Sequence, residues 1–152
     1  MSTIPGYEVV FLLGGAFREA IDAAHRDLAQ QGHPEARPLH AFALQAIGPH
    51  GVTVSELGRR LGVSKQAAAK TARTLETAGY VRREPDPTDA RASVVTRTQR
   101  GVELLALGAA SFERHISDWR KTLGPERFEA MIAALREITS IPRLGDFPGW
   151  LG

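Results

Sequence analysis

The amino-acid sequence predicts a mainly α-helical α+β fold with about six helices and one two-stranded β-hairpin. Three observations lead to this prediction. Apolar residues recur at helical spacing along most of the chain, glycine and proline divide these segments into pieces of helix length, and the stretch after Gly79 changes to an extended pattern. At 152 residues the chain has the size of one domain with its own core.

The first helix is expected to begin near Pro5, which suits a first helical turn, and to end before Gly32. Its apolar residues, three and four positions apart, are Leu13, Phe17, Ala20, Ile21, Ala24 and Leu28. A connector with two prolines, residues 32–38, precedes a second helix over about Leu39 to Ile47, which Gly48 ends. The side chains expected to face inward from this helix are Leu39, Phe42, Ala43 and Ile47.

Two short capped helices are predicted next. Thr53 and Glu56 have the spacing of a capping box, and Gly62 ends the helix that they begin. Ser64 then caps a fourth helix that runs to Gly79. Two helices joined by a tight glycine turn are typical of a helix-turn-helix.

The fourth helix carries basic and polar side chains away from its apolar face, namely Lys65, Gln66, Lys70 and Arg73. In a helix-turn-helix such side chains read base edges in the major groove of DNA. Gln66 can pair with adenine, and Lys65 with guanine or a phosphate. The alternative is an ordinary solvated helix face. The basic hairpin that follows makes DNA contact the preferred interpretation.

The hairpin consists of two extended segments, Tyr80 to Arg83 and Ala92 to Thr96, on either side of a turn rich in proline and aspartate. Thr98 is expected to cap a fifth helix. Its apolar seam is Leu105, Ala109, Phe112, Ile116, Trp119 and Leu123. Because this heptad-like seam is about three turns longer than a monomer core needs, it predicts a dimer. A sixth helix follows Pro125, and a tail rich in proline and glycine begins at Pro142.

Charge and composition narrow the function further. Between Arg59 and Arg100 there are ten Lys or Arg against four acidic residues, a local balance of +6 in a chain of net charge +2. Clustered positive charge favours a polyanion partner, although a basic solvated surface is the alternative. No cysteine is present, and the five histidines lack metal-ligand spacing, so neither a metal nor a cofactor is expected. With no nucleophile elbow or phosphate-binding loop, the chain is not expected to be an enzyme.

No run of about 20 apolar residues and no secretory signal occurs in the sequence, which predicts a cytoplasmic protein without membrane partners.

The stretch from Val52 to Gly101 resembles the DNA-binding core of the multiple antibiotic resistance regulator (MarR) family. It carries the wing pattern of Asp86, Pro87, Asp89 and Arg91, with Thr53, Gly62, Ser64 and Gly79 in register. The resemblance implies a winged helix-turn-helix lobe over residues 38–98. It also implies a helical dimerisation region formed by residues 1–37 and 99–152.

The resemblance also implies roles for individual residues. The helix that begins after Ser64 would enter the major groove, and Arg91 at the wing tip would enter the minor groove, where arginine suits the narrow negative channel. Asp89 would hold the wing, and Arg82 and Arg83 would lie beside phosphates. A small aromatic or phenolic effector would bind between the two regions. The side chains that could line such a pocket, or equally fill a core, are Phe17, His40, Phe42 and Trp119.

Two positions depart from the family pattern. Arg97 stands where an apolar residue usually precedes the capping threonine, which leaves the end of the second wing strand open and could add a phosphate contact. Ala69 replaces a frequent small hydroxyl residue, so one polar contact to DNA is missing.

The predicted function is therefore sequence-specific binding of double-stranded DNA by a homodimer that acts as a ligand-responsive repressor on a pseudo-palindromic operator. The alternative is a protein-interaction module that keeps the winged shape, although such a module has no reason to retain Arg91 and its basic surroundings.

Overall fold

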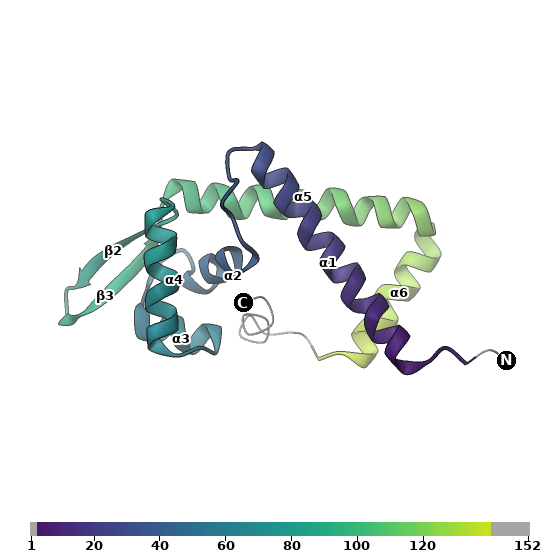
Figure 1. The fold of residues 1–152 in the computed structure, drawn as a ribbon, viewed down its shortest axis with the longest axis horizontal. Coiled ribbons are helices and arrows are strands. Elements are labelled where there is room, and N and C mark those ends of the chain that lie inside the picture. The colour runs from purple at the N-terminus through teal and green to yellow at the C-terminus, as the bar shows by residue number, and fades with distance from the viewer. Residues whose placement is uncertain (1–2, 141–152) are drawn as a thin grey trace.

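The computed structural model describes residues 3–140 and contains six helices and three strands over that range (Figure 1). In chain order they are α1 (Gly6–Gln30), α2 (Pro38–Ile47), β1 (Val52–Thr53), α3 (Val54–Leu61), α4 (Lys65–Thr77), β2 (Val81–Asp86), β3 (Asp89–Arg97), α5 (Gln99–Leu123) and α6 (Pro125–Ile138). The predicted mainly helical fold with a small wing is confirmed. The predicted tail from Pro142 lies outside the described residues.

The helices and the sheet form two parts (Figure 1). Helices α2, α3 and α4 and the sheet make a lobe at one end, from which the hairpin of β2 and β3 projects. Helix α5 leaves this lobe and runs along the molecule, α1 packs across it, and α6 folds back from its far end. Within residues 3–140 no helix combines the length and the low charge that crossing a membrane requires.

The sheet has one strand more than predicted. Its order is β1-β3-β2, all antiparallel, because the two residues Val52 and Thr53 pair with Val95 and Val94 of β3. The hairpin strands are also longer than predicted and reach Asp86 and Asp89, with a shift in register after Pro85. Proline has no N–H to donate to a strand ladder, so a proline-rich turn did not suggest pairing this close to the tip.

Three predicted helix caps are present. Thr53 Oγ1 accepts a hydrogen bond from Glu56 N at 3.2 Å, Ser64 Oγ accepts one from Ala67 N at 3.1 Å, and Thr98 Oγ1 accepts one from Gly101 N at 3.2 Å. The Glu56 carboxylate does not complete the predicted capping box, because it pairs with Arg59 and Arg60 one turn further along α3.

The core lies in the lobe and includes Leu44, Leu57, Leu75, Tyr80 and Val95, each without solvent exposure. Helix α2 differs from the prediction. His40 and Leu44 are buried, whereas Leu39 and Phe42 are only half-buried. Helix α2 contacts α3, α4 and α5, so its buried face is wider than one stripe and includes positions that a simple periodicity leaves out.

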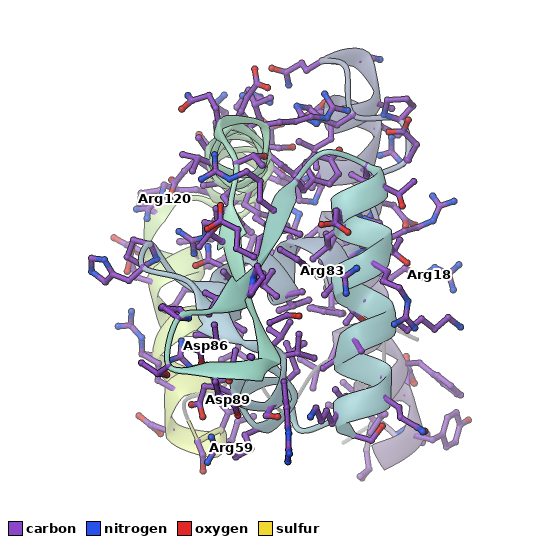
Figure 2. All side chains as sticks on the ribbon, turned by 90° about the vertical axis from the view of Figure 1, so that its left-hand side faces the viewer. Arg18, Arg59, Arg83, Asp86, Asp89 and Arg120 are labelled. Carbon is purple, nitrogen blue, oxygen red and sulfur yellow. The ribbon has the colours of Figure 1, made fainter. Side chains whose placement is uncertain are left out.

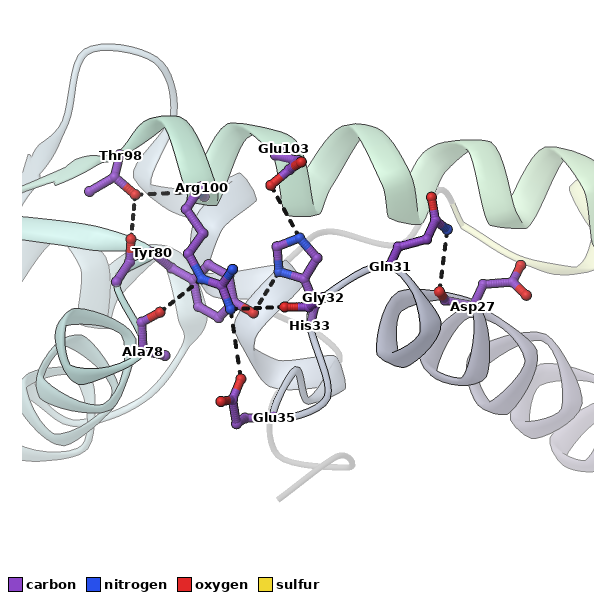
Figure 3. Close-up of polar contacts among 12 residues, drawn as sticks. Asp27, Gln31, Gly32, His33, Glu35, Ala78, Tyr80, Thr98, Arg100 and Glu103 are labelled. Carbon is purple, nitrogen blue, oxygen red and sulfur yellow. Dashed lines mark hydrogen bonds and ion pairs between the residues drawn. The ribbon is translucent and has the colours of Figure 1, made fainter.

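The lobe is joined to the long helices by a small polar cluster (Figure 3). The Arg100 guanidinium, on the first turn of α5, donates to the carbonyls of Ala78 and Gly32 at 3.1 Å each. It also lies over the ring of Tyr80, 5.0 Å from the ring centre. The Tyr80 hydroxyl meets His33 of the connector between α1 and α2. These contacts fix α4 and the hairpin relative to α1 and α5.

Candidate nucleic-acid interface

Helix α4 buries one face and exposes the opposite one. Ala68, Ala72 and Leu75 are fully buried in the lobe. With about 100° of rotation per residue, the side chains opposite them are Gln66, Lys70, Arg73 and Thr77, and all four are exposed. Lys65 is exposed beside them in the first turn. The helix therefore presents a polar, basic face to solvent along its whole length, from its capped N-terminus at Ser64 to Thr77.

The wing lies along one edge of this face (Figure 2). Between α4 and the hairpin there is a hollow of about 150 Å³. Its lining residues are Thr53, Val54, Ser55, Lys65, Ala69, Arg83, Arg91, Ala92 and Ser93. Lys65 and Arg91, both predicted to contact DNA, thus come together across a hollow with an open mouth.

The conformation of the wing tip is held by two aspartates (Figure 2). The Asp86 carboxylate accepts hydrogen bonds from the backbone N–H and the hydroxyl of Thr88 at 2.9 and 2.8 Å, which lowers its pKa below the usual value. Asp89 Oδ1 accepts a hydrogen bond from the backbone N–H of Arg91 at 2.9 Å. Asp89 therefore orders the backbone that carries Arg91, and the Arg91 guanidinium forms no ion pair with any residue in the range 3–140.

Arg82 and Arg83 are placed differently. Arg83 Nε donates to Glu76 Oε1 of α4 at 3.1 Å, and Arg83 N donates to Glu76 Oε2 at 3.2 Å. Arg83 thus ties β2 to α4. Because the Glu76 carboxylate partly neutralises its charge, Arg83 attracts a further anionic partner less strongly. Arg82 is exposed, since neighbouring residues of a strand point to opposite faces.

The chain is similar to MarR proteins in sequence and in fold. The MarR family model matches residues 37–92, which span the lobe from α2 to the wing. A transcriptional regulator from Thermotoga maritima is 26% identical, with 87% of this chain and 92% of that one covered and a TM-score of 0.63. A crystal structure of MarR is also 26% identical, over 89% of this chain and 95% of that one, with a TM-score of 0.67. Residues 37–92 therefore match the MarR family, and the chain as a whole has the fold of these MarR-type structures.

A further structure with the same fold is a mutant of MepR from S. aureus bound to an oligodeoxyribonucleotide, which is 20% identical with a TM-score of 0.63 over 89% of this chain and 96% of that one. No curated protein sequence matches the chain significantly. MarR regulators bind DNA and are not enzymatic, and the matched lobe makes this chain a DNA-binding transcriptional regulator of that winged-helix type.

Arg97 explains one departure from the MarR pattern. Its Nε donates to the carbonyl of Leu44 at 2.8 Å and its Nη2 to that of Gln45 at 3.4 Å, so the guanidinium satisfies carbonyls at the C-terminal end of α2. Partial burial lowers the pKa of this group. Strand β3 runs through Arg97, which pairs with Val81. The structure thus gives Arg97 a role in holding α2, and the phosphate contact that the sequence suggested stays a prediction.

The four residues predicted to line an effector pocket do not all line the same hollow. A second hollow, of about 560 Å³, is lined by Glu35, Arg37, His40, Lys70, Arg73, Thr74, Thr77 and Ala78. His40 is part of it, and Phe17, Phe42 and Trp119 are not among the lining side chains of the described range. The Trp119 ring instead packs edge-on against His115, with ring centres 5.3 Å apart.

Arg37 and Glu35 in this hollow were missed by the sequence analysis. Both lie in the connector before α2, where nothing in the local pattern indicates that the chain returns to the exposed face of α4.

Proposed function

We propose that this protein binds a pseudo-palindromic operator as a homodimer, with α4 in the major groove and the wing in the adjacent minor groove. One observation carries the proposal. The exposed side chains of Lys65, Gln66, Lys70 and Arg73 lie on the solvent side of α4, beside a wing whose Arg91 has no ion pair within residues 3–140. A helix of this kind fits the major groove, and an arginine fits the narrow minor groove.

Each predicted contact residue has a role in this arrangement. Ser64 caps α4 and orients its first turn, where Lys65 and Gln66 reach base edges. Lys70 and Arg73 follow along the same face and neutralise phosphates. On the wing, Arg82 lies toward the backbone and Arg91 toward the minor groove, while Asp89 fixes the turn. Arg83 positions the wing through Glu76 and contributes a weaker phosphate contact.

The proposed homodimer follows from exposed apolar surface on the long helices. Side chains in and just before the first half of α1 are more than half exposed, with Ile4 at 58%, Tyr7 at 67%, Val10 at 66%, Phe11 at 73% and Leu12 at 63%. A run of large apolar side chains on one helix segment marks an interaction surface. The dimerisation region of residues 1–37 and 99–152 would bury it against a second copy. Residues 38–98 would form the DNA-binding lobe.

Repression and ligand response belong to the same proposal. A dimer that covers a promoter excludes the transcription machinery, and an effector relieves this only if it binds more tightly to an arrangement that does not fit the operator. The proposed effector is a small aromatic or phenolic compound. Support for it is the family resemblance, together with His40 of α2, which lines the hollow between α4 and the connector.

Selection of bound sequences from a random duplex pool by the purified full chain tests the function. We expect an enriched inverted repeat with half-sites centred about one helical turn apart, or a multiple of it, because each protomer offers one α4. Failure to enrich any sequence would instead favour the protein-interaction module. Enrichment of a single half-site would contradict the dimeric arrangement.

A further inference from the structure

The larger hollow, of about 560 Å³, borders the part of α4 away from the wing. Residues from the connector, α2 and α4 form it. Arg37, Glu35 and His40 come from the connector and the first turn of α2, and Lys70 and Arg73 come from α4 with two threonines, Thr74 and Thr77. The threonine hydroxyls bond back to the carbonyls of Lys70 and Arg73, so they help to form the wall.

The charges in this hollow are unbalanced. Arg37, Lys70 and Arg73 form no ion pair with any residue between 3 and 140. The single carboxylate, that of Glu35, lies 3.8 Å from Arg100, which partly neutralises it. The pKa of His40 is lowered, first by burial and then by the positive charge of Arg37. Three cations from two separate elements thus face one open space without internal partners.

The position of this hollow relative to the wing is set by the helix. Since successive residues turn by about 100°, Lys70 lies about 140° around α4 from Lys65, and Gln66 and Arg73 lie between them. Lys65 borders the hollow beside the wing, and Lys70 borders the hollow beside Arg37. The DNA-facing side of α4 is therefore flanked by the wing on one edge and by Arg37 on the other.

A helix inserted in the major groove has a phosphate backbone on each side of it. We propose that Arg37, with Lys70 and Arg73, binds a backbone phosphate of the operator on the side of the major groove opposite the wing. This inference rests on the proposed docking of α4. It adds a contact from outside the helix-turn-helix and the wing, which fixes the angle of α4 in the groove. The hollow is wide and open, which suits a phosphate on a duplex that lies across it.

Binding of the selected operator and of a scrambled duplex by the full chain, followed by fluorescence anisotropy over a salt series, tests the assignment. Arg37→Ala is expected to weaken binding to both duplexes and to reduce the slope of log K against log salt by about one, because one phosphate contact is lost. Arg37→Lys keeps the charge and is expected to keep the slope. Lys121→Ala serves as the matched control, since Lys121 is 76% exposed on the last turn of α5, far from the lobe.

An unchanged slope in Arg37→Ala would overturn the assignment, and so would a loss confined to the operator. A wild-type chain that binds no duplex would instead refute the proposed function itself, so the two failures differ. Inorganic phosphate is the other anion that could bind these three cations. If Arg37→Ala loses the binding of inorganic phosphate that wild type shows, but keeps the wild-type affinity and salt slope on both duplexes, the hollow is a small-anion site and the backbone assignment is wrong.

Discussion

His33 and Tyr80 lie 47 residues apart in the sequence, and His33 Nδ1 is 2.9 Å from the Tyr80 hydroxyl. Both side chains are buried, and their rings are stacked with centres 5.6 Å apart. His33 Nε2 also lies 3.3 Å from the carboxylate of Glu103 on α5 (Figure 3). The connector from α1, the segment that follows α4 and the start of α5 thus meet at one junction.

Gly101 lies in this junction on the first turn of α5. A Cβ at this position would overlap the carbonyl oxygen of Tyr80 and would approach Leu44 Cδ2 at 3.2 Å. Gly101→Ala is therefore expected to lower the free energy of unfolding by about 1–3 kcal/mol, because backbone must move to make room. Urea denaturation followed by circular dichroism measures the change.

Gly108, two turns further along α5, is the control. A Cβ there meets no atom of the described structure within 4 Å, so Gly108→Ala is expected to raise the free energy of unfolding by about 0.5–1 kcal/mol through the higher helix propensity of alanine. If Gly101→Ala proved as stable as wild type, the close contact between α5 and Tyr80 would not exist in solution.

Asp27 links α1 to α5 through Ser111 and Arg114. Hydrogen bonds from Ser111 Oγ at 2.5 Å and from Arg114 Nη2 at 2.9 Å lower the pKa of Asp27 below its ordinary value of 3.8. Because the folded pKa is depressed, the stabilisation is present above pH 3.8 and is lost as the pH falls through the folded pKa.

Ser111→Ala removes the largest cause of this shift, so the pKa of Asp27 is expected to rise toward 3.8. Carboxyl ¹³C chemical shifts followed through an acid titration report it. Ser117→Ala, an exposed serine on the same helix, is the control and should leave the Asp27 titration as in wild type. An unmoved Asp27 pKa in Ser111→Ala would show that the α1–α5 hydrogen bond does not persist in solution.

Arg91 and Gln66 separate the two kinds of DNA contact. Arg91→Ala is expected to weaken operator binding by about 1–3 kcal/mol and to reduce the salt slope by about one, because a charge leaves the minor groove. Gln66→Ala should relax the preference at one base position and leave the salt slope nearly unchanged. Both are measured on operator and scrambled duplexes over a salt series. Wild-type affinity of Arg91→Ala at every salt concentration would show that the wing does not touch DNA.

Phe11 is the sharpest probe of the proposed dimer. Its side chain is 73% exposed and stacks edge-on with Tyr7 on α1. Phe11→Asp is expected to convert the dimer to a monomer, since a carboxylate buried at an apolar interface costs several kcal/mol. Gel filtration with light scattering gives the mass. Gln45→Asp places the same charge on the exposed surface of α2 in the lobe and should remain dimeric. A Phe11→Asp dimer as stable as wild type would place the interface elsewhere.

Local signals made most of the fold predictable. Thr53, Ser64 and Thr98 each mark a helix start, because a hydroxyl that accepts from a backbone N–H three residues on needs no tertiary context. The strand Val52–Thr53 was not predictable, since its only partner, β3, follows about 40 residues later and two residues carry no periodicity.

In the candidate interface, too, the local pattern was predictable and contacts between distant segments were not. The basic face of α4 follows from helical spacing alone. Arg97 could not be separated from a DNA contact by sequence, because its acceptors, the carbonyls of Leu44 and Gln45, lie more than 50 residues earlier. Arg37 was missed for the same reason, since its proximity to Lys70 and Arg73 arises only when α2 folds against α4.

A single residue, Thr98, separates the wing strand from α5, and its hydroxyl donates to the Gly79 carbonyl while accepting from Gly101 N. The connection between β3 and α5 is therefore short and held by hydrogen bonds at both ends. Helix α5 has 25 residues, so it is about 37 Å long, and one residue more or less would turn its far end by about 100° and shift it by about 1.5 Å. The length of α5 therefore acts as a ruler. In the proposed dimer on DNA, it would set the rotational phase at which each lobe meets the turns of the duplex, so this phase would depend on the number of residues in α5 and on no contact with a base.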